Sequence, residues 1–261
     1  MTRQQRIDVL VGLVSERGRI SIADIRDELA VSTATARRDL TLLAREGVVT
    51  RSRGQAVVRG GGLQPEPQVS APQSARDAAM ARAAVALLSP GDTVGLRGGP
   101  VAMEVARNLA RSDRLSTGGG ASGVTVVTNA LDIAYELSLW SHVKLVITGG
   151  VTGRRSFDMV GPLVTSALAE LVLDAAIVGV DGLTTRFGAT TAREDEATVS
   201  REFVRNARRV IVVADSTRLR QSTFARICGF SDIDVVVTDR RPDPRFADAL
   251  RSSGIELVVA D

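Results

Sequence analysis

Cysteine and histidine are almost absent from this chain of 261 residues, since Cys228 and His142 are the only examples of their kinds. A single cysteine excludes an intramolecular disulfide, and one residue of each type excludes a Cys/His zinc site or a dyad of two histidines. The sequence also lacks a run of about 18 uncharged apolar residues, which a membrane span would need. The first ten residues are charged and have no apolar core typical of a secretory signal. We therefore expect a cytoplasmic protein without metal, cofactor or membrane.

Lysine is scarce as well, because Lys144 is the only lysine among 33 basic residues. The charge is unevenly distributed along the chain. Residues 1–60 carry 11 arginines and 7 acidic residues, a net charge of +4, whereas the remaining residues carry a net charge of −1. A basic surplus confined to the first quarter of the chain favours a nucleic-acid partner for that part.

A change of composition divides the chain. Residues 60–74 contain three consecutive glycines and three of the eight prolines, without apolar periodicity. Such a segment cannot bury enough surface to offset its ordering entropy, so we interpret it as a flexible linker. The sequence thus predicts a small domain at 1–59, a linker at 60–74 and a larger domain at 75–261.

The pattern before the linker is helical. Four apolar residues recur at i, i+3, i+4 and i+7, which predicts a first helix ending near Gly18: Ile7, Leu10, Val11 and Val14. Ser21 is a suitable N-cap for a second helix, and Ser32 for a third that runs to about Glu46. Two short helices joined by a tight turn predict a helix-turn-helix unit, whose second helix enters the major groove of DNA.

The third helix has two different faces. Ala36, Leu40 and Leu43 share an apolar face, and the opposite face carries arginine, threonine and a small residue. Strand-like runs at 48–50 and 56–58 around a basic tip predict a wing. Exposed arginines also occur merely for solubility, but here turn, cap, polar face, wing and charge agree. We expect the following residues to contact DNA: Ser32, Thr33, Ala34, Thr35, Arg37, Arg38, Thr41, Arg51 and Arg53.

These residues carry a family resemblance. The chain reads VSTATARRDL from Val31 to Leu40, followed by Leu43, Gly47, Arg51 and Gly54. This resembles the winged helix-turn-helix of DeoR-family bacterial repressors, whose pattern is close to V-S-x-x-T-[IVA]-R-R-D-L with a wing of the type R-x-H-G-G-A. The wing departs from the pattern, because residues 53–56 read RGQA in place of His-Gly-Gly-Ala.

Strands and helices alternate after the linker. Runs rich in valine and isoleucine predict strands at 93–96, 124–128, 143–148, 175–180, 210–214, 235–238 and 256–259. Helices are predicted at 76–88, 102–111, 131–139, 164–173, 197–207 and 245–252. Continuous apolar strands are typical of a parallel sheet covered by helices on both faces, so we expect an α/β domain with a mostly parallel sheet.

Ligands of open α/β sheets bind at the carboxyl ends of the strands. The residues that follow several predicted strands are small or polar, although a glycine there is more often just a turn. We expect an effector site formed by Arg97, Gly98, Gly99, Thr128, Asn129, Gly149, Gly150, Asp181 and Gly182. In this order they resemble the effector-binding domain of DeoR-family repressors, which is related in fold to ribose-5-phosphate isomerase. The resemblance implies a phosphorylated sugar as effector, and dimers or tetramers built by this domain.

The first loop departs from the family. The usual D-x-G-T-T resembles a phosphate cradle, whereas residues 97–101 read RGGPV. Pro100 has no N–H and Val101 has no hydroxyl, so two potential donors are lost. Arg97 adds a cation, which favours an anion held by another geometry. Loss of phosphate binding is the alternative. The family's lysine on a later helix is replaced by Ser200, and residues 116–123 form a glycine-rich insertion expected to be a flexible loop.

The sequence as a whole predicts a DNA-binding transcriptional regulator, a repressor of carbohydrate-metabolism genes that is controlled by a small anionic metabolite such as a phosphorylated sugar. Its expected partners are a double-stranded DNA operator, the effector, and further copies in a homodimer or homotetramer. One alternative is an enzyme resembling a sugar-phosphate isomerase. We expect no catalytic residues, because neither paired carboxylates nor a Lys/Glu couple is evident. The other alternative is a regulator whose larger domain only oligomerises.

Overall fold

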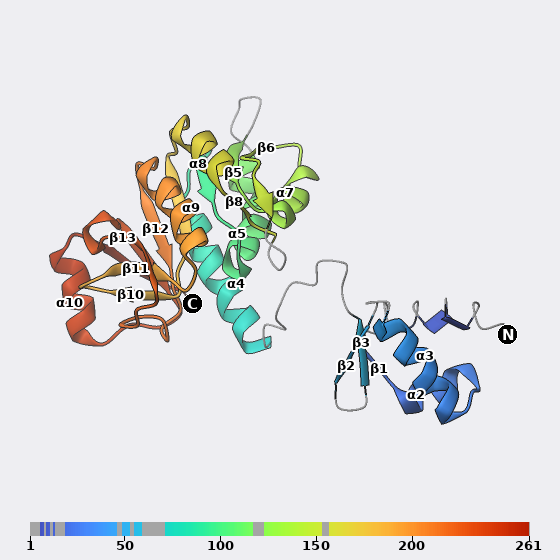
Figure 1. The fold of residues 1–261 in the computed structure, drawn as a ribbon. Helices are drawn as coiled ribbons and strands as arrows, with labels where there is room; N and C mark the ends of the chain where they lie inside the picture. Colours follow the sequence, from blue (N-terminus) through green and yellow to red (C-terminus); the bar gives the residue numbers. More distant parts are fainter. Residues whose placement is uncertain are drawn as a thin grey trace. The chain divides into compact units, whose positions relative to one another are not determined.

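The computed structural model describes residues 6–7, 9–10, 13, 19–45, 49–52, 55–58, 71–116, 123–152 and 157–260. The chain divides into two compact units, Met1–Gln64 and Pro65–Asp261, which are described separately (Figure 1). No helix of the described residues combines the length and apolar content that a membrane span requires.

The first unit is a winged helix-turn-helix. Its elements are β1 (Arg19–Ser21), α2 (Ile22–Leu29), α3 (Thr33–Arg45), β2 (Val49–Ser52) and β3 (Gln55–Val58). The strands form an antiparallel sheet in the order β1-β3-β2, so the predicted two-stranded wing is confirmed and gains a third strand. Residues 6, 7, 9, 10 and 13 are helical, as the first apolar stripe predicts. Val11 and Val14 of that stripe lie outside the described residues.

A small apolar core holds the helices of this unit together. It consists of Ile7, Leu10, Ile25, Ala36, Leu40 and Leu43, all buried. Each helix contributes the residues that its 3.6-residue periodicity places on one face. The turn between α2 and α3 begins at Ala30, whose φ of 50° closes α2 in a left-handed conformation. After this tight turn, α3 packs against α2.

The second unit is built on a seven-stranded sheet. Its strands are β4 (Thr93–Leu96), β5 (Val124–Thr128), β6 (Val143–Ile147), β9 (Ala175–Gly179), β12 (Val210–Val213), β14 (Val235–Thr238) and β15 (Glu256–Val259). They pair in parallel in the order β15-β14-β12-β9-β4-β5-β6. All seven predicted strands are therefore confirmed, within a residue at each end.

Helices cover both faces of this sheet. On one face the core is shared with α4 (Ala71–Ala86), α5 (Pro100–Ala110), α6 (Asp113–Ser116) and α7 (Leu131–Ser138). On the other face it is shared with α8 (Pro162–Ala169), α9 (Glu194–Arg205), the 3₁₀ helix η1 (Phe230–Asp232) and α10 (Pro244–Ser252). Successive residues of one strand belong to different cores, since Ile177 packs on the first face and Val178 on the second. The sheet is thus buried on both sides, as its continuous apolar strands predict.

Two small antiparallel elements were not expected from the sequence. One is a sheet of β10 (Gly182–Thr184), β11 (Gly188–Thr191) and β13 (Ala225–Cys228), in the order β10-β11-β13. The other is the pair β7 (Val151–Thr152) and β8 (Met159–Val160). These strands have only two to four residues, and none of them contains a long run of valine and isoleucine such as those that reveal the central sheet.

The helix after the linker begins earlier than expected. α4 starts at Ala71 rather than at residue 76, so residues 71–74 of the predicted linker belong to its first turn. Pro72 is compatible with this position, because the N–H groups of a first turn need no helical partner. Linker residues 60–70 and residues 117–122 of the expected flexible loop lie outside the described residues.

The strand order creates a crevice at one place in the sheet. From β4 the chain proceeds to β5 and β6 on one side, and then returns to β9 on the other side of β4. The segments that leave β4 and β9 therefore diverge at their carboxyl ends, which is where ligands of open α/β sheets bind. Residues 97–99 and 181–182 follow these two strands.

Candidate functional site

Helix α3 separates core and surface as expected. Ala36, Leu40 and Leu43 are buried. The DNA-contact residues predicted on this helix lie on its accessible side, with Thr35 only partly exposed and the others exposed: Ser32, Thr33, Ala34, Thr35, Arg37, Arg38 and Thr41. A helix fixed by one face and presenting arginines on the other has the geometry needed for a major groove.

Local hydrogen bonds fix the ends of the two helices. Ser21 Oγ accepts from the Asp24 N–H while the Asp24 carboxylate accepts from the Ser21 N–H, a capping box for α2. Ser32 Oγ accepts from the Thr35 N–H at 3.2 Å, so the predicted N-cap of α3 is confirmed. The Ser32 hydroxyl is also 2.9 Å from the Thr35 hydroxyl.

One charged residue of α3 points inward. Asp39 is buried and accepts from Arg6 Nε at 2.6 Å, which ties the first helix to α3. Asp39 therefore supports the fold, whereas its neighbours Arg37 and Arg38 face outward. The Thr41 hydroxyl donates to the Arg37 carbonyl within the helix. Of the predicted wing contacts, Arg51 has only its backbone described, in β2, and Arg53 lies outside the described residues.

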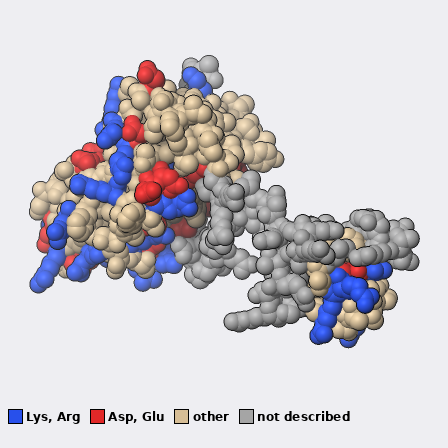
Figure 2. Space-filling view, in the orientation of Figure 1, with Lys and Arg blue, Asp and Glu red and all other residues tan. Residues whose placement is uncertain are grey.

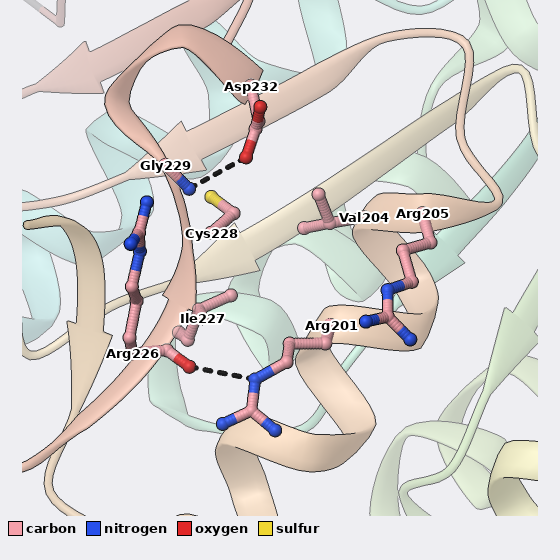
Figure 3. A pocket seen from close by; sticks show the side chains of 8 residues that line it. All are labelled: Arg201, Val204, Arg205, Arg226, Ile227, Cys228, Gly229 and Asp232. Carbon is pink, nitrogen blue, oxygen red and sulfur yellow. Dashed lines mark hydrogen bonds between the residues drawn. The ribbon is translucent and has the colours of Figure 1, made fainter.

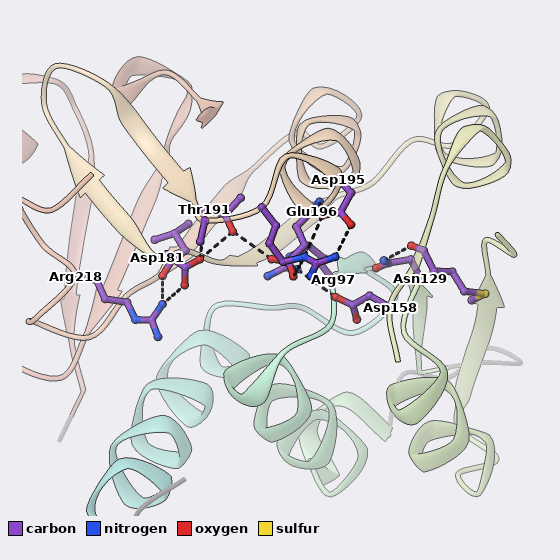
Figure 4. A network of polar contacts seen from close by, with 12 residues as sticks. Arg97, Asn129, Asp158, Asp181, Thr191, Asp195, Glu196 and Arg218 are labelled. Carbon is purple, nitrogen blue, oxygen red and sulfur yellow. Dashed lines mark hydrogen bonds and ion pairs between the residues drawn. The ribbon is translucent and has the colours of Figure 1, made fainter. Parts of the chain in front are cut away.

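In the second unit, Arg97 stands at the centre of a polar network at the carboxyl edge of the sheet (Figure 4). Its Nη1 lies 3.2 Å from Asp158 Oδ2 and 3.4 Å from Glu196 Oε2, and its side chain is only 10% exposed. Arg97 Nε is buried and has no hydrogen-bond partner among the described residues. The predicted cation is thus present in the crevice, but two carboxylates already pair with it.

Gly98 makes room for this ion pair. A Cβ atom on Gly98 would lie 1.7 Å from Asp158 Oδ1 and 2.9 Å from the Ala130 Cβ. Gly99 has a φ of 128° and precedes α5, which begins with Pro100 and has no side-chain cap. The first N–H groups of α5 therefore face the same edge of the sheet as Arg97.

Thr128 ends β5, and Asn129 follows it beside this ion pair. Asn129 is buried, and its Nδ2 donates to the Met159 carbonyl at 2.8 Å. Asn129 Oδ1 is buried without a hydrogen-bond partner within the described part of the chain. The Thr128 hydroxyl accepts from the Ala130 N–H and so shapes the turn into α7. Asn129 thus keeps an acceptor without a partner next to Asp158.

Asp181 follows β9 at the other side of the crevice. Its carboxylate accepts from the Thr191 hydroxyl and the Ala192 N–H, each at 2.9 Å, and pairs with Arg218. Burial opposes ionisation of this carboxyl, but these hydrogen bonds and Arg218 outweigh it and lower the pKa of Asp181 below its usual value. Thr191 also lies 3.2 Å from Glu196, which links Asp181 to Arg97.

Arg218 extends the network to β12. It donates to the Val180 carbonyl and pairs with Asp215 through Nε at 3.2 Å. Burial opposes ionisation of Asp215, yet hydrogen bonds from Thr217 and the Arg218 charge lower its pKa. Asp77 of α4 is buried nearby, where desolvation and the Asp215 charge raise its pKa. The charges of this network therefore act on Asp77 of α4.

Asp158 is the member of the network with the largest change in acidity. Burial raises the pKa of Asp158 to about 6, because desolvation, together with the Glu196 and Asp132 carboxylates, outweighs the attraction of Arg97. A carboxyl of this kind releases Arg97 more readily than an ordinary carboxylate, since it takes up a proton near neutral pH.

The remaining predicted residues shape the backbone. Gly149 and Gly150 have φ angles of 73° and 127° and lead from β6 into β7. A Cβ on Gly150 would lie 2.6 Å from Val164 Cγ2, and a Cβ on Gly182 would lie 2.5 Å from the Gln221 carbonyl oxygen. Gly150 also approaches Met159, so these positions border the network although their glycines are required by the fold.

Sequence reasoning did not find several partners in the network. They are Asp158 just before β8, Thr191 in β11, Glu196 in α9 and Arg218 in the segment after β12. None of them directly follows a strand of the central sheet, so the rule that identified Arg97 and Asp181 does not apply to them. Only Arg218 could have been found from the sequence, because it lies three residues after Asp215 and can pair with it.

A separate cleft of about 440 Å³ lies between α9 and β13 (Figure 3). Its lining includes Arg201, Arg205, Arg226 and Cys228, and none of the predicted site residues. Arg201 Nε donates to the Arg226 carbonyl at 2.9 Å, which joins helix and strand. Burial raises the pKa of Cys228 to about 11, so its thiol is protonated at neutral pH. The hydrogen bond of Arg201 and the burial of Cys228 are structural roles, so we assign no ligand to this cleft.

The first unit is a winged helix-turn-helix with exposed arginines on α3, and the second is an α/β unit with a polar site at its strand ends. This combination defines a ligand-sensing transcriptional regulator. Two family models agree with this class: the DeoR-like helix-turn-helix domain matches residues 6–59, and the DeoR C terminal sensor domain matches residues 73–240. The chain belongs to the DeoR family of transcriptional regulators.

Relatives match over nearly the whole length. The HTH-type transcriptional regulator GlpR of Haloferax volcanii is 31% identical over 98% of this chain and 96% of its own length. The HTH-type transcriptional repressor GlcR of Bacillus subtilis is 28% identical over 100% of this chain and 98% of its own length. The glycerol-3-phosphate regulon repressor of Escherichia coli is 24% identical over 99% of this chain and 100% of its own length. These relatives and both family models are regulators, so the enzyme alternative is not supported.

Solved structures give more distant likenesses. The full-length sorbitol operon regulator SorC from Klebsiella pneumoniae has a TM-score of 0.41 at 16% identity, over 96% of this chain and 99% of that chain. Ribose 5-phosphate isomerase A from Methanocaldococcus jannaschii has a TM-score of 0.39 at 19% identity, over 55% and 53%.

Proposed function

We propose that this chain represses carbohydrate-metabolism genes by holding an operator through α3 and the wing. The observation that carries the proposal is the face of α3 on which Arg37 and Arg38 are exposed, opposite its buried apolar face. Arginine can bond bidentately to guanine and pair with phosphates. Arg51 and Arg53 of the wing add phosphate contacts in this proposal. The names of GlcR and of the glycerol-3-phosphate regulon repressor support repression as the mode of action.

A small anionic metabolite such as a phosphorylated sugar controls the repressor by binding at the carboxyl ends of β4, β5 and β9. Arg97 is the cation of this site, and the Gly98 and Gly99 N–H groups lie beside it. An incoming anion replaces Asp158 on Arg97, and Asp158 then takes up a proton at low cost because its pKa is raised to about 6. The ligand hydroxyls have acceptors in Asn129 Oδ1 and the Asp181 carboxylate.

The ligand acts by binding one arrangement of the protein more tightly than another. Asp77 of α4 interacts electrostatically with Asp215 and Arg218 of the site. A change in the position of Arg218 therefore alters the electrostatic environment of Asp77. Helix-turn-helix proteins read two half-sites through a symmetric dimer, and we propose a cytoplasmic homodimer or homotetramer held by the second unit.

An electrophoretic shift assay on DNA upstream of the chain's own gene tests both parts. Wild type should retard this DNA, and one member of a panel of phosphorylated and free sugars should change the retarded fraction. Arg97→Ala should abolish that response, whereas Arg111→Ala, which removes an exposed arginine just after α5, should keep it. Absence of retardation at low salt refutes the repressor. Retardation without any metabolite response, and without a ligand-induced melting shift, refutes the sensor and leaves a domain that only oligomerises.

A further inference from the structure

Helix α7 is apolar on two sides, although only one of them is covered. Ile133 and Leu137 are buried in the core. Leu131, Tyr135 and Leu139 follow one another at four-residue spacing and are 39%, 72% and 69% exposed. Residues four apart lie on one face of a helix. Asp132 and Glu136 also lie on α7, but an exposed apolar stripe of this kind marks a surface that contacts a partner, so the outer face of α7 is a candidate contact surface.

The neighbouring edge of the sheet has the same character. β6 is the last strand of the sheet order, and only β5 pairs with it among the described strands. Ile147 at the end of β6 and Val151 in β7 are exposed. The hydrogen bond from the Leu131 N–H to the Phe157 carbonyl and the pairing of Val151 with Val160 join these segments into one flank. We call Leu131, Tyr135, Leu139, Ile147 and Val151 the α7–β6 face.

The α7–β6 face is poor in charge. In Figure 1, α7 and β6 lie on the same flank of the second unit, and Figure 2 shows this flank as a broad area of uncharged residues. The charged residues on these two elements are Lys144, which is exposed in β6, and Asp132 and Glu136 of α7, which are half-buried, with Glu136 paired to Arg107. Charged residues make up 24% of the chain, so such an area is unusual for a surface that meets only water.

We propose that the α7–β6 face is the contact between two copies of this chain, related by a twofold axis. The inference rests on the proposed function, because an operator read by two heads requires a dimer. A twofold contact places each group against its own copy, so a patch with net charge repels itself while an uncharged apolar patch does not. The free edge of β6 is also self-complementary, since a second β6 running antiparallel supplies the missing N–H and carbonyl partners.

A second exposed apolar pair serves as the contrast. Phe187 follows β10, and Phe224 precedes β13 and is 80% exposed. The Arg186 guanidinium lies 4.8 Å from the centre of the Phe187 ring and covers part of it. Neither phenylalanine belongs to a helix or to an edge strand of the central sheet, so we do not assign this region to the contact between copies.

The test compares matched variants of the full chain by light scattering after size exclusion and by operator binding. Wild type should be a dimer or tetramer, and Tyr135→Glu with Leu139→Glu should halve its mass or reduce it to a monomer. Operator affinity should fall by at least about 10-fold, because linked heads gain effective concentration. Phe224→Glu should keep the wild-type mass and affinity. A monomeric wild type, a double variant of wild-type mass, or dissociation by Phe224→Glu refutes the interface.

Hydrogen exchange of the wild type gives a reading that does not depend on how the variants fold. Amides of α7 and β6 should exchange more slowly at high than at low protein concentration, while those of β10, β11 and β13 should not change. Concentration-independent exchange of α7 and β6 refutes the interface. If a monomeric wild type binds the operator, the interface fails and the proposed function survives, whereas an intact dimer that binds no operator refutes the proposed function alone.

Discussion

The carboxyl of Asp158 should govern how the stability of the second unit changes between pH 4 and pH 7. Its pKa is 3.8 in an unfolded chain and about 6 in the folded protein. The folded state therefore keeps a proton that the unfolded state has lost, so the contribution of Asp158 to stability is greatest below pH 4 and is lost as the pH rises to about 6. Converting the pKa difference gives a loss of roughly 3 kcal/mol.

Asp158→Asn replaces this carboxyl with a neutral group of the same shape. The variant should match wild type near pH 4 and become the more stable protein as the pH rises, by up to roughly 3 kcal/mol at pH 7. The pKa values of Asp181 and Asp215 are lowered, so these carboxyls lose their stabilising contacts only in more acid solution. They therefore do not change the stability between pH 4 and pH 7. Asp77 and Asp132, whose pKa values are also raised, are present in both proteins.

Urea unfolding followed by the fluorescence of Trp140, the only tryptophan, reports on this unit alone. The free energy of unfolding is compared from pH 4 to pH 7 for wild type, Asp158→Asn and Asp248→Asn. The last variant removes an exposed carboxylate of α10 and controls for the change in net charge. Parallel profiles for wild type and Asp158→Asn would show that Asp158 does not bear the raised pKa, and the exchange of Asp158 for an anion on Arg97 would then lose its physical basis.

Three further outcomes are expected. Arg38→Ala should weaken operator binding by about 1–3 kcal/mol and change sequence preference if it contacts a base, whereas Arg251→Ala in α10 should not, as fluorescence anisotropy at fixed salt can measure. Gly98→Ala should destabilise the second unit by about 1–3 kcal/mol in urea, because its Cβ has no room, while Gly179→Ala meets no atom within 4 Å and should cost less. Leu40→Ala should cost the first unit about 2–5 kcal/mol by leaving a cavity, and a circular-dichroism melt showing no change would contradict its burial.

The helix-turn-helix was predictable because its signals are local. The N-cap at Ser32, the apolar spacing of Ala36, Leu40 and Leu43, and the outward direction of Arg38 all depend on residues within a few turns of helix. The seven central strands were predictable for a related reason, since strands buried on both faces must be apolar throughout. The short strands β10, β11 and β13 are also largely buried, but they contain no continuous run of valine and isoleucine and gave no such signal.

The site was predictable only in part. The sequence alone determined that Arg97, Asn129 and Asp181 come directly after strands, and parallel strands end at a common edge, so these residues had to lie near one another. Only the tertiary structure decided that Asp158 and Glu196 reach Arg97, from positions 61 and 99 residues further along the chain. Ion pairs of this kind depend on where β8 and α9 pack against the sheet, and packing is set by the whole core rather than by the residues that flank a carboxylate.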